Sequence, residues 1–432
     1  MMSPMVEPGA VAERRVSERA VVGILAGVQF VNILDFMIVS PLGPDFSGTI
    51  GIAESDLGYV VGSYTASACL SGLVGSLVLD RFDRRKALAV AMVGLVVGTA
   101  ACGFATNLWT LVLARVVAGF FGGPATSLSY AILADVVPAE RRGRAVSLMM
   151  GAFSAAAVLG VPAGLELAQL GSWRTAFFAV AALGLAVTIA ATVALPPLRG
   201  HLSLAAGYVQ TSLGALLARP IVRRSYLMTA TAMMASFILI PNLSAYTQRN
   251  LGYPRDAIGG LYGAGGVASL LAMFVVGRLV DRFGSTLIAT VGTVAIILVV
   301  WFGFVAYSPA FPVLALFVAF MLAMTVRNVA YNTLTTKVPE ASERARFMSI
   351  QSAVGHAASA AGALAGPSLL TTLPGGQLAG IETCAYISIG LSLVLPGLMW
   401  IVERRVRARS VSHEAVMAAV QPAAVLRTPP SH

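Results

Sequence analysis

The chain is 432 residues long, of which 57% are hydrophobic and 11% charged, and its mean hydropathy is +0.82. This composition excludes a water-soluble globular protein, because no soluble core buries so much apolar surface and so few charges cannot keep the rest in water. The formal net charge of +10 would suit a nucleic-acid-binding protein, but the distribution of the basic residues, described below, argues against that class.

Twelve apolar segments are long enough to cross a bilayer, whose hydrocarbon core takes about 20 helical residues. The predicted fold class is therefore an all-α polytopic membrane protein with twelve transmembrane helices, six in each half of the chain. The segments begin near Ala20, Leu57, Ala87, Leu108, Arg144, Thr175, Arg223, Ala257, Thr286, Phe311, Arg346 and Glu382.

Polar segments precede, join and follow the two sets of spans. The predicted divisions are a leader (1–19), an N-terminal bundle (20–197), a linker (198–222), a C-terminal bundle (223–402) and a disordered tail (403–432). Within the linker, the stretch from Ser203 to Leu217 fits an amphipathic helix on the inner leaflet as well as it fits a plain linker.

Basic residues are distributed very unequally between the loops. With twelve spans, 24 of the 29 Lys and Arg residues fall on the side that holds both termini. Such an excess marks the cytoplasmic side of a membrane protein. We therefore expect a multi-pass protein of the inner cell membrane with both termini in the cytoplasm, in contact with lipid and not with nucleic acid.

The two sets of spans are copies of one unit. Residues 35–83 align without a gap with residues 236–284, at a shift of 201. Coinciding positions include Phe36 with Phe237, Gly58 with Gly259, Gly62 with Gly263, and Asp80 with Asp281. Parallel repeats with an even number of spans are typical of two-halved transporters. The copies differ at Asp35, whose counterpart is Ser236.

The loop after the second span of each copy carries a signature. Residues 277–284 read G-R-L-V-D-R-F-G, and residues 76–85 read S-L-V-L-D-R-F-D-R-R. Both segments resemble the loop motif G-x-L-x-D-R-x-G of the major facilitator superfamily, although Ser76 and Asp83 replace the two glycines of the first copy.

Two further segments resemble the same family. Arg115 and Gly119 have the spacing of its fourth-helix motif. Gly160, Pro162 and Gly164 resemble the fifth-helix glycine-proline motif, here a candidate hinge, of its drug and sugar efflux branch, with Val161 interrupting the usual Gly-Pro pair. The resemblance covers about residues 20–403 and implies two six-helix bundles around a central cavity that opens alternately to each side.

The loop signatures are expected to form a cytoplasmic latch. The Asp80 carboxylate can meet nearby arginines, or accept from amides at the start of the helix near Arg346, the usual partner by resemblance. Such contacts would form only when the halves close on this side; the alternative is that the charges merely hold the loops inside. The latch candidates are Asp80, Arg81, Arg84, Arg85, Asp135, Gly277, Asp281, Arg282 and Gly284.

Two charges lie within predicted spans at similar depth. Asp35 is about 15 residues into the first span, and Arg115 about seven residues into the fourth, which runs the other way through a core of about 30 Å. Gln29, Asn32 and Asp35 recur every third residue as a polar stripe. An Asp that exchanges an Arg partner for a proton has the properties of a coupling site; the alternative is a static ion pair.

The remaining candidates lie in the tenth and eleventh spans. Arg327, Asn328 and Asn332 belong to a polar band that fits cavity lining and interhelical hydrogen bonding equally well. His356 fits a proton shuttle or a packing histidine. Because the sequence shows no metal-ligand spacing and no ATP-binding loop, we expect no metal, no cofactor and no enzymatic activity.

These features together predict a monomeric secondary transporter that exports a small organic molecule, a drug or a metabolite, in exchange for protons. The residues do not decide the direction, so proton-linked import of a nutrient such as a sugar stays open. A membrane sensor that keeps the fold without transporting is the alternative from a different class.

Overall fold

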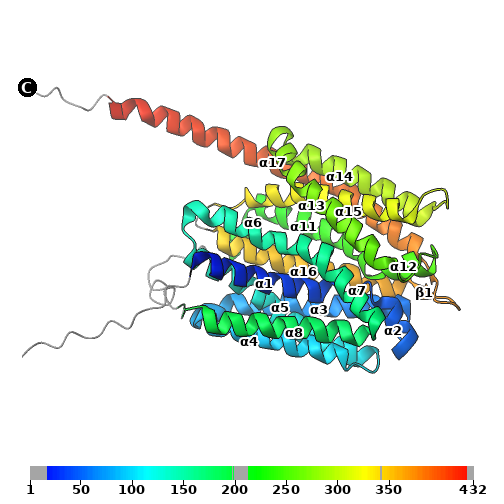
Figure 1. Cartoon of the computed structure of the whole chain (residues 1–432). Coiled ribbons are helices and arrows are strands. Elements are labelled where there is room, and N and C mark those ends of the chain that lie inside the picture. Colours follow the sequence, from blue (N-terminus) through cyan, green and yellow to red (C-terminus); the bar gives the residue numbers. More distant parts are fainter. Residues whose placement is uncertain (1–16, 197, 199–212, 341–342, 426–432) are drawn as a thin grey trace, which may run out of the picture.

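A computed structural model describes residues 17–196, 198, 213–340 and 343–425, apart from the side chains of 76–78, 80, 139–140, 142–144, 213, 345 and 410–425. Its helices lie side by side in one bundle (Figure 1), and a single two-stranded hairpin joins the last two spans among the described residues.

The helices of the N-terminal half precede residue 198, and those of the C-terminal half follow residue 212. The first half contains α1 (Glu18–Met37), α2 (Gly43–Ile50), η1 (Glu54–Asp56), α3 (Leu57–Val78), η2 (Leu79–Arg81), α4 (Arg84–Gly103), α5 (Leu108–Val136), α6 (Ala139–Ala155), the π-helical η3 (Ala156–Gly160), α7 (Val161–Leu170) and α8 (Trp173–Ala194). The second half contains α10 (Leu213–Ala218), α11 (Pro220–Phe237), η4 (Ile240–Asn242), α12 (Leu243–Arg249), α13 (Ile258–Phe283), α14 (Ser285–Val300), the π-helical η5 (Trp301–Val305), α15 (Val313–Thr336), α16 (Arg344–Leu369), β1 (Thr371–Thr372), β2 (Leu378–Ala379) and α17 (Ile381–Val425).

The predicted all-α polytopic fold is confirmed. Among the described residues, 11 helical stretches are long and apolar enough to cross a membrane. The one predicted span that is not among these 11 is α16, which at 26 residues is long enough to cross a membrane. It is less apolar than the others because it is rich in Ala, Gly and Ser and carries Gln351 and His356. It nevertheless packs against α3 in the middle of the bundle.

The prediction of a disordered tail is wrong for residues 403–425, which continue α17 as a helix; residues 426–432 lie outside the described part. The segment is rich in Ala and Arg, which favour helix. Glu403 accepts from Arg407 one turn later at 2.8 Å, and Arg409 donates to the carbonyl of Val338 at 2.6 Å, which ties the helix to the end of α15.

The linker prediction is tested only in part. α10 occupies its end, and α11 begins at Pro220 and not near Arg223, because proline is well accepted in the first turn of a helix. Residues 203–212 of the expected amphipathic helix lie outside the described residues.

The two halves meet along two helix pairs, α3 with α16 and α7 with α13. A Cβ atom at Gly58 of α3 would come within 2.2 Å of the Ala363 carbonyl oxygen of α16. Gly259, the repeat counterpart of Gly58, lies against Pro162 of α7, where an added Cβ would be 3.8 Å from its Cα. The same repeat position therefore serves both contacts, because small residues let helix backbones approach closely.

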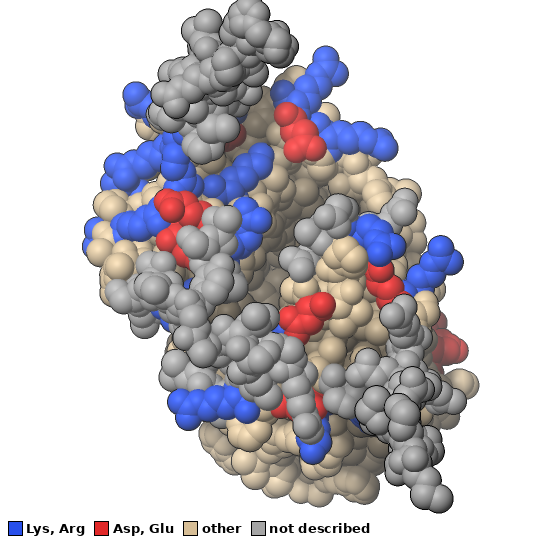
Figure 2. Space-filling model, turned by 90° about the vertical axis from the view of Figure 1, so that its left-hand side faces the viewer, with Lys and Arg blue, Asp and Glu red and all other residues tan. Residues whose placement is uncertain are grey.

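The two ends of the bundle differ. We call the end where α1 starts and α17 leaves the bundle the basic end, and the opposite end the far end. Figure 2 views the basic end, where Lys and Arg gather and the surface is hollowed between the two lobes. The polar contacts between the halves that are described next lie at the far end, whereas the surface at the basic end is hollowed between the lobes.

Ion pairs join the halves at the far end. Arg255 donates to both carboxylate oxygens of Asp45, at 3.0 and 2.5 Å, and Arg249 lies 3.2 Å from Glu54. In both pairs the acid belongs to the N-terminal half and the base to the C-terminal half. Further bonds run from the Ser40 hydroxyl to the Ile240 carbonyl (2.8 Å), from the Ser244 hydroxyl to the Pro41 carbonyl (3.3 Å) and from the Ser55 amide to the Thr372 hydroxyl (3.0 Å).

Replacing Arg255 by Ala is expected to shift the protein toward conformations in which the far end is open. The pair is bidentate and only about a quarter exposed (27% and 26%), so its loss should cost about 1 kcal/mol, or about fivefold in the conformational equilibrium. Spin labels on α2 and α12 would report the change as a longer distance distribution. The charge-reversed variant Asp45→Arg/Arg255→Asp should restore the original distribution, and an unchanged distribution in Arg255→Ala would contradict the prediction.

Candidate functional site

Asp35 and Arg115 form a buried ion pair in the N-terminal half. Nη1 of Arg115, from α5, lies 2.8 Å from Oδ2 of Asp35, from α1, and both side chains are 0% exposed. Thr99 of α4 donates its hydroxyl to the other carboxylate oxygen at 2.7 Å. The two charges that the sequence places at similar depth thus lie within hydrogen-bond distance of each other, and side chains of α4 and α5 hold the carboxylate of α1.

The polar stripe of α1 continues from this pair. The ring of Tyr64, from α3, lies 4.3 Å from the guanidinium carbon of Arg115, and its hydroxyl donates to Oδ1 of Asn32 at 2.6 Å. The amide of Asn32 donates to the hydroxyl of Thr126 at 2.5 Å, which in turn donates to Oε1 of Gln29 at 3.3 Å. The polar side chains of α1 and α5 therefore belong to one network with Tyr64.

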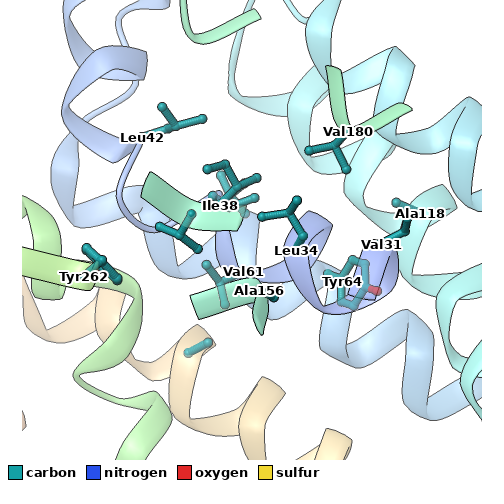
Figure 3. Close-up of a cluster of buried hydrophobic side chains, with 14 of the residues drawn as sticks. Val31, Leu34, Ile38, Leu42, Val61, Tyr64, Ala118, Ala156, Val180 and Tyr262 are labelled. Carbon is teal, nitrogen blue, oxygen red and sulfur yellow. The ribbon is translucent and has the colours of Figure 1, made fainter. Parts of the chain in front are cut away.

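Apolar side chains enclose this network. Figure 3 shows Val31 and Leu34 of α1 close to Tyr64, with Ala118 of α5 beside Val31, and all are buried. Nε and Nη2 of Arg115 are buried without a hydrogen-bond partner in the described part of the chain. Because both side chains are fully buried, the two charges interact strongly, and a proton that neutralises Asp35 would leave Arg115 with the Tyr64 ring as its partner.

The C-terminal half is arranged differently at the repeat-related position. Ser236 of α11, the counterpart of Asp35, accepts a hydrogen bond from Nη2 of Arg327 of α15 at 2.5 Å. Arg327 is 1% exposed, and its other contacts are the Ala232 carbonyl at 3.4 Å and the Met324 sulfur at 3.2 Å. No ion pair of Arg327 occurs among the described residues, so this candidate belongs to a second site.

The remaining polar candidates join neither group by a hydrogen bond within the described residues. Asn328 is half-buried, with Oδ1 buried and unpartnered there. Asn332 is exposed and His356, on α16, is half-buried. Their roles stay predictions.

The arginines after the first loop signature make contacts within their own half. Arg84 pairs with Asp135, another latch candidate, at the end of α5, at 2.5 Å. Arg85 donates to the Thr192 carbonyl near the end of α8. Both residues thus tie the start of α4 to helices that end at the basic end.

The first signature also contains a helix cap that was missed. Asp83 stands where the motif has glycine, and it accepts from the backbone amide of Arg85 at 2.9 Å, which satisfies one free amide at the start of α4. Arg81 is exposed. The side chain of Asp80 lies outside the described part, so its latch role stays a prediction.

The second loop signature is held by α17. Gly284 has a φ of +92°, which favours glycine, and a Cβ atom there would lie 2.5 Å from Nη2 of Arg407. Glu403 caps α14 by accepting from the amides of Ser285 at 3.1 Å and Thr286 at 2.8 Å. This explains the final glycine of the motif in this copy.

The other members of the second signature lie at the surface. Asp281 and Arg282 are exposed, and the guanidinium of Arg282 lies 5.2 Å from the Phe283 ring. A Cβ atom at Gly277 would meet nothing within 4 Å, so the local structure gives no packing reason for this glycine.

The glycine-proline motif lies where α7 touches both α1 and the other half. The π-helical turn η3 ends at Gly160, two residues before Pro162, and such a turn accommodates a missing backbone donor. A Cβ atom at Gly160 would come within 2.8 Å of the Leu34 side chain of α1, and one at Gly164 within 2.6 Å of Ile38, which caps the end of α1. Pro162 faces Gly263 of α13, where an added Cβ would be 3.6 Å from its Cγ. The motif therefore connects the helix of Asp35 to the C-terminal half.

Several functional residues escaped the sequence reasoning. Tyr64 and Thr99 complete the Asp35 site, but no spacing marks them. At the far end Glu54 had a usable signal, because the shift of 201 places it on Arg255, a residue of opposite charge. Equivalent loops with opposite charge are complementary once the halves meet.

Comparison with known proteins agrees with this architecture. The sequence matches the family model described as Major Facilitator Superfamily over residues 25–226 and again over 225–430. Among solved structures, a D-xylose-proton symporter superposes with a TM-score of 0.72 at 18% identity, covering 89% of this chain and 97% of the other.

Two further solved structures share the fold. A bacterial homologue of the human lysosomal transporter Spinster, in an inward-facing conformation, has a TM-score of 0.67 at 16% identity, covering 92% of this chain and 98% of its own. The nucleoside transporter NupG has a TM-score of 0.69 at 16% identity, with coverages of 89% and 100%.

Replacing Arg115 by Gln is expected to destabilise the fold, because Asp35 would remain buried without its counter-charge. Removing one partner of a buried pair typically costs about 3 to 5 kcal/mol. Thermal unfolding of the purified protein in detergent would show a lower midpoint. The double variant Asp35→Asn/Arg115→Gln should recover most of the loss, since neither charge remains, whereas equal melting of the single and double variants would argue against the pair as the cause.

Proposed function

The chain belongs to the major facilitator superfamily, and on that premise we propose that it exports a small organic molecule, a drug or metabolite, in exchange for protons. The observation that carries the proposal is the buried pair of Asp35 and Arg115, whose carboxylate has no counterpart at Ser236 in the other copy. The fold does not require a carboxylate there, because the C-terminal half packs without one. We propose that the protein acts as a monomer and without a cofactor.

The pair is well placed to couple a proton to movement of the halves. Phe36 follows Asp35 in α1, and its ring lies 5.9 Å from the ring of Phe237, its repeat counterpart in α11. Phe36 also contacts Tyr64 at 5.3 Å, the residue that faces Arg115. Protonation of Asp35 would weaken its attraction to Arg115, and the resulting shift of α1 would be passed directly to the ring pair between the halves.

We place the basic end in the cytoplasm, since the excess of Lys and Arg marks the cytoplasmic side. The described conformation is then open to the cytoplasm and closed outside by the Arg255–Asp45 and Arg249–Glu54 pairs. Closure of the basic end would bring the loop signatures with Asp80 and Asp281 against the other half. Alternating access would thus exchange one set of polar contacts for the other.

Proton-linked import of a nutrient is the second candidate. A protein of this fold is a D-xylose-proton symporter, and the buried pair would serve either direction. Export is supported by the resemblance of the segment around Pro162 to the efflux motif. Measuring whether the solute is accumulated or depleted against its gradient would separate the two.

Asp35→Asn is expected to abolish solute movement driven by an imposed pH gradient in proteoliposomes, because the amide cannot exchange a proton. Exchange of labelled for unlabelled solute without a gradient should persist. Glu166→Gln is the matched control, since Glu166 is an exposed carboxylate near the end of α7, and this variant should transport normally. Unchanged gradient-driven transport in Asp35→Asn would remove Asp35 from the mechanism.

The proposed sidedness predicts a labelling pattern in a variant without Cys69, Cys102 and Cys384. Ala310→Cys, exposed at the far end, should react with a membrane-impermeant maleimide in intact cells. Arg282→Cys, exposed at the basic end, should react only after the membrane is permeabilised. The reverse pattern would place the basic end outside the cell.

A further inference from the structure

We propose that Arg327 binds the carboxylate of the transported molecule, so that the substrate class is an organic anion. The inference rests on the proposed transport function and adds the chemical class of the substrate. It concerns the chemical class of the substrate and not the direction of transport, because a positively charged site attracts an anion from either side of the membrane.

The first argument is the environment of the Arg327 guanidinium. The side chain is 1% exposed, and its hydrogen-bond partners are the neutral Ser236 hydroxyl at 2.5 Å, the Ala232 carbonyl and the Met324 sulfur. Its Nε is buried without a partner among the described residues. A buried charge with only neutral partners is costly in a membrane protein, which makes a site for an anion favourable.

The second argument is that the C-terminal half has no internal acid to neutralise Arg327. Each acidic residue between positions 220 and 402 lies near a helix end or in a loop: Asp256, Asp281, Glu340, Glu343 and Glu382. Glu340 and Glu343 already contact Arg219, at 3.1 and 2.5 Å. Local rearrangement of this half therefore cannot supply a carboxylate at mid-span.

The third argument is the contrast between the two copies. In each half an arginine donates to the same repeat position of the first helix. Arg115 donates to Asp35 in α1, and Arg327 donates to Ser236 in α11. In the first half this position provides a carboxylate; in the second it provides a hydroxyl. A guanidinium prefers the two oxygens of a carboxylate, so the second site is complementary to a carboxylate that arrives with a ligand.

The position of the site also fits transport. Ser236 directly precedes Phe237, whose ring meets Phe36 of the other half. Asn328, next to Arg327, is half-buried and keeps an unpartnered amide oxygen in the described structure. The site thus borders the junction of the halves. Asp35, the acid at the repeat position equivalent to Ser236, is already paired with Arg115.

The test uses the purified full chain in detergent and matched probe pairs that differ only in charge, each a carboxylate and its amide, such as benzoate and benzamide. Binding is measured by thermal shift over a concentration series. The wild type should bind carboxylates about tenfold or more tightly than amides, the ratio that one charge-assisted hydrogen bond produces. Arg327→Gln should lose this preference, and Arg327→Lys should keep part of it.

A second pair of variants keeps the test decisive if Arg327→Gln fails to fold. Ser236→Asp places a carboxylate beside Arg327 and should abolish carboxylate preference in a folded protein. Ser236→Asn has nearly the same size without the charge and should retain it. The inference is overturned if Ser236→Asp and Ser236→Asn show the same carboxylate preference. It is also overturned if the carboxylate and its amide stabilise the wild type equally, or if neither stabilises it.

The outcomes separate this inference from the proposed function. Gradient-driven transport of a neutral or cationic solute, with no carboxylate preference, would overturn the inference and leave proton-coupled transport standing. The opposite outcome has two parts: the wild type prefers carboxylates and Ser236→Asp does not, but the wild type shows no gradient-driven transport. That outcome would support the binding site and contradict the proton coupling.

Discussion

A charge buried between membrane helices is costly unless an opposite charge balances it, and this constraint distinguishes the interiors of the two halves. Asp35 is balanced by Arg115 and Thr99, which draws α1, α4 and α5 together at one depth. Tyr64 adds α3 through its ring and its hydroxyl. The N-terminal half is therefore packed around a neutral pair, whereas the C-terminal half retains the positive charge of Arg327 at the matching place.

The seam between the halves obeys a different constraint, that of close backbone approach. Lipid offers no hydrophobic drive for helix association, so small residues and shape determine which helices meet. Gly58 and Gly259 occupy one repeat position and serve the two pseudo-symmetric contacts with α16 and α7. Pro162, after its π-helical turn, extends this seam to α1. A seam of small side chains has few interlocking groups to separate, which suits two bodies that rock against each other.

The two ends of the bundle use charge in opposite ways. At the far end, acids of one half face bases of the other, and the halves are joined. At the basic end, charges pair within a half, as in Arg84 with Asp135 and Glu403 with Arg407, while the surface between the lobes is hollowed.

The sequence by itself determined the fold class, the duplicated unit, the starts of the membrane-spanning helices to within about five residues and the similar depth of Asp35 and Arg115. Hydropathy and a constant shift of 201 report position along the chain, and position along a helix is depth in the membrane. Only the tertiary structure decided which side chains face each other: Tyr64 and Thr99 around the pair, Ser236 under Arg327, and Asp45 opposite Arg255. Those contacts depend on how each helix is rotated about its axis and which helix lies beside it, which packing of the whole bundle sets.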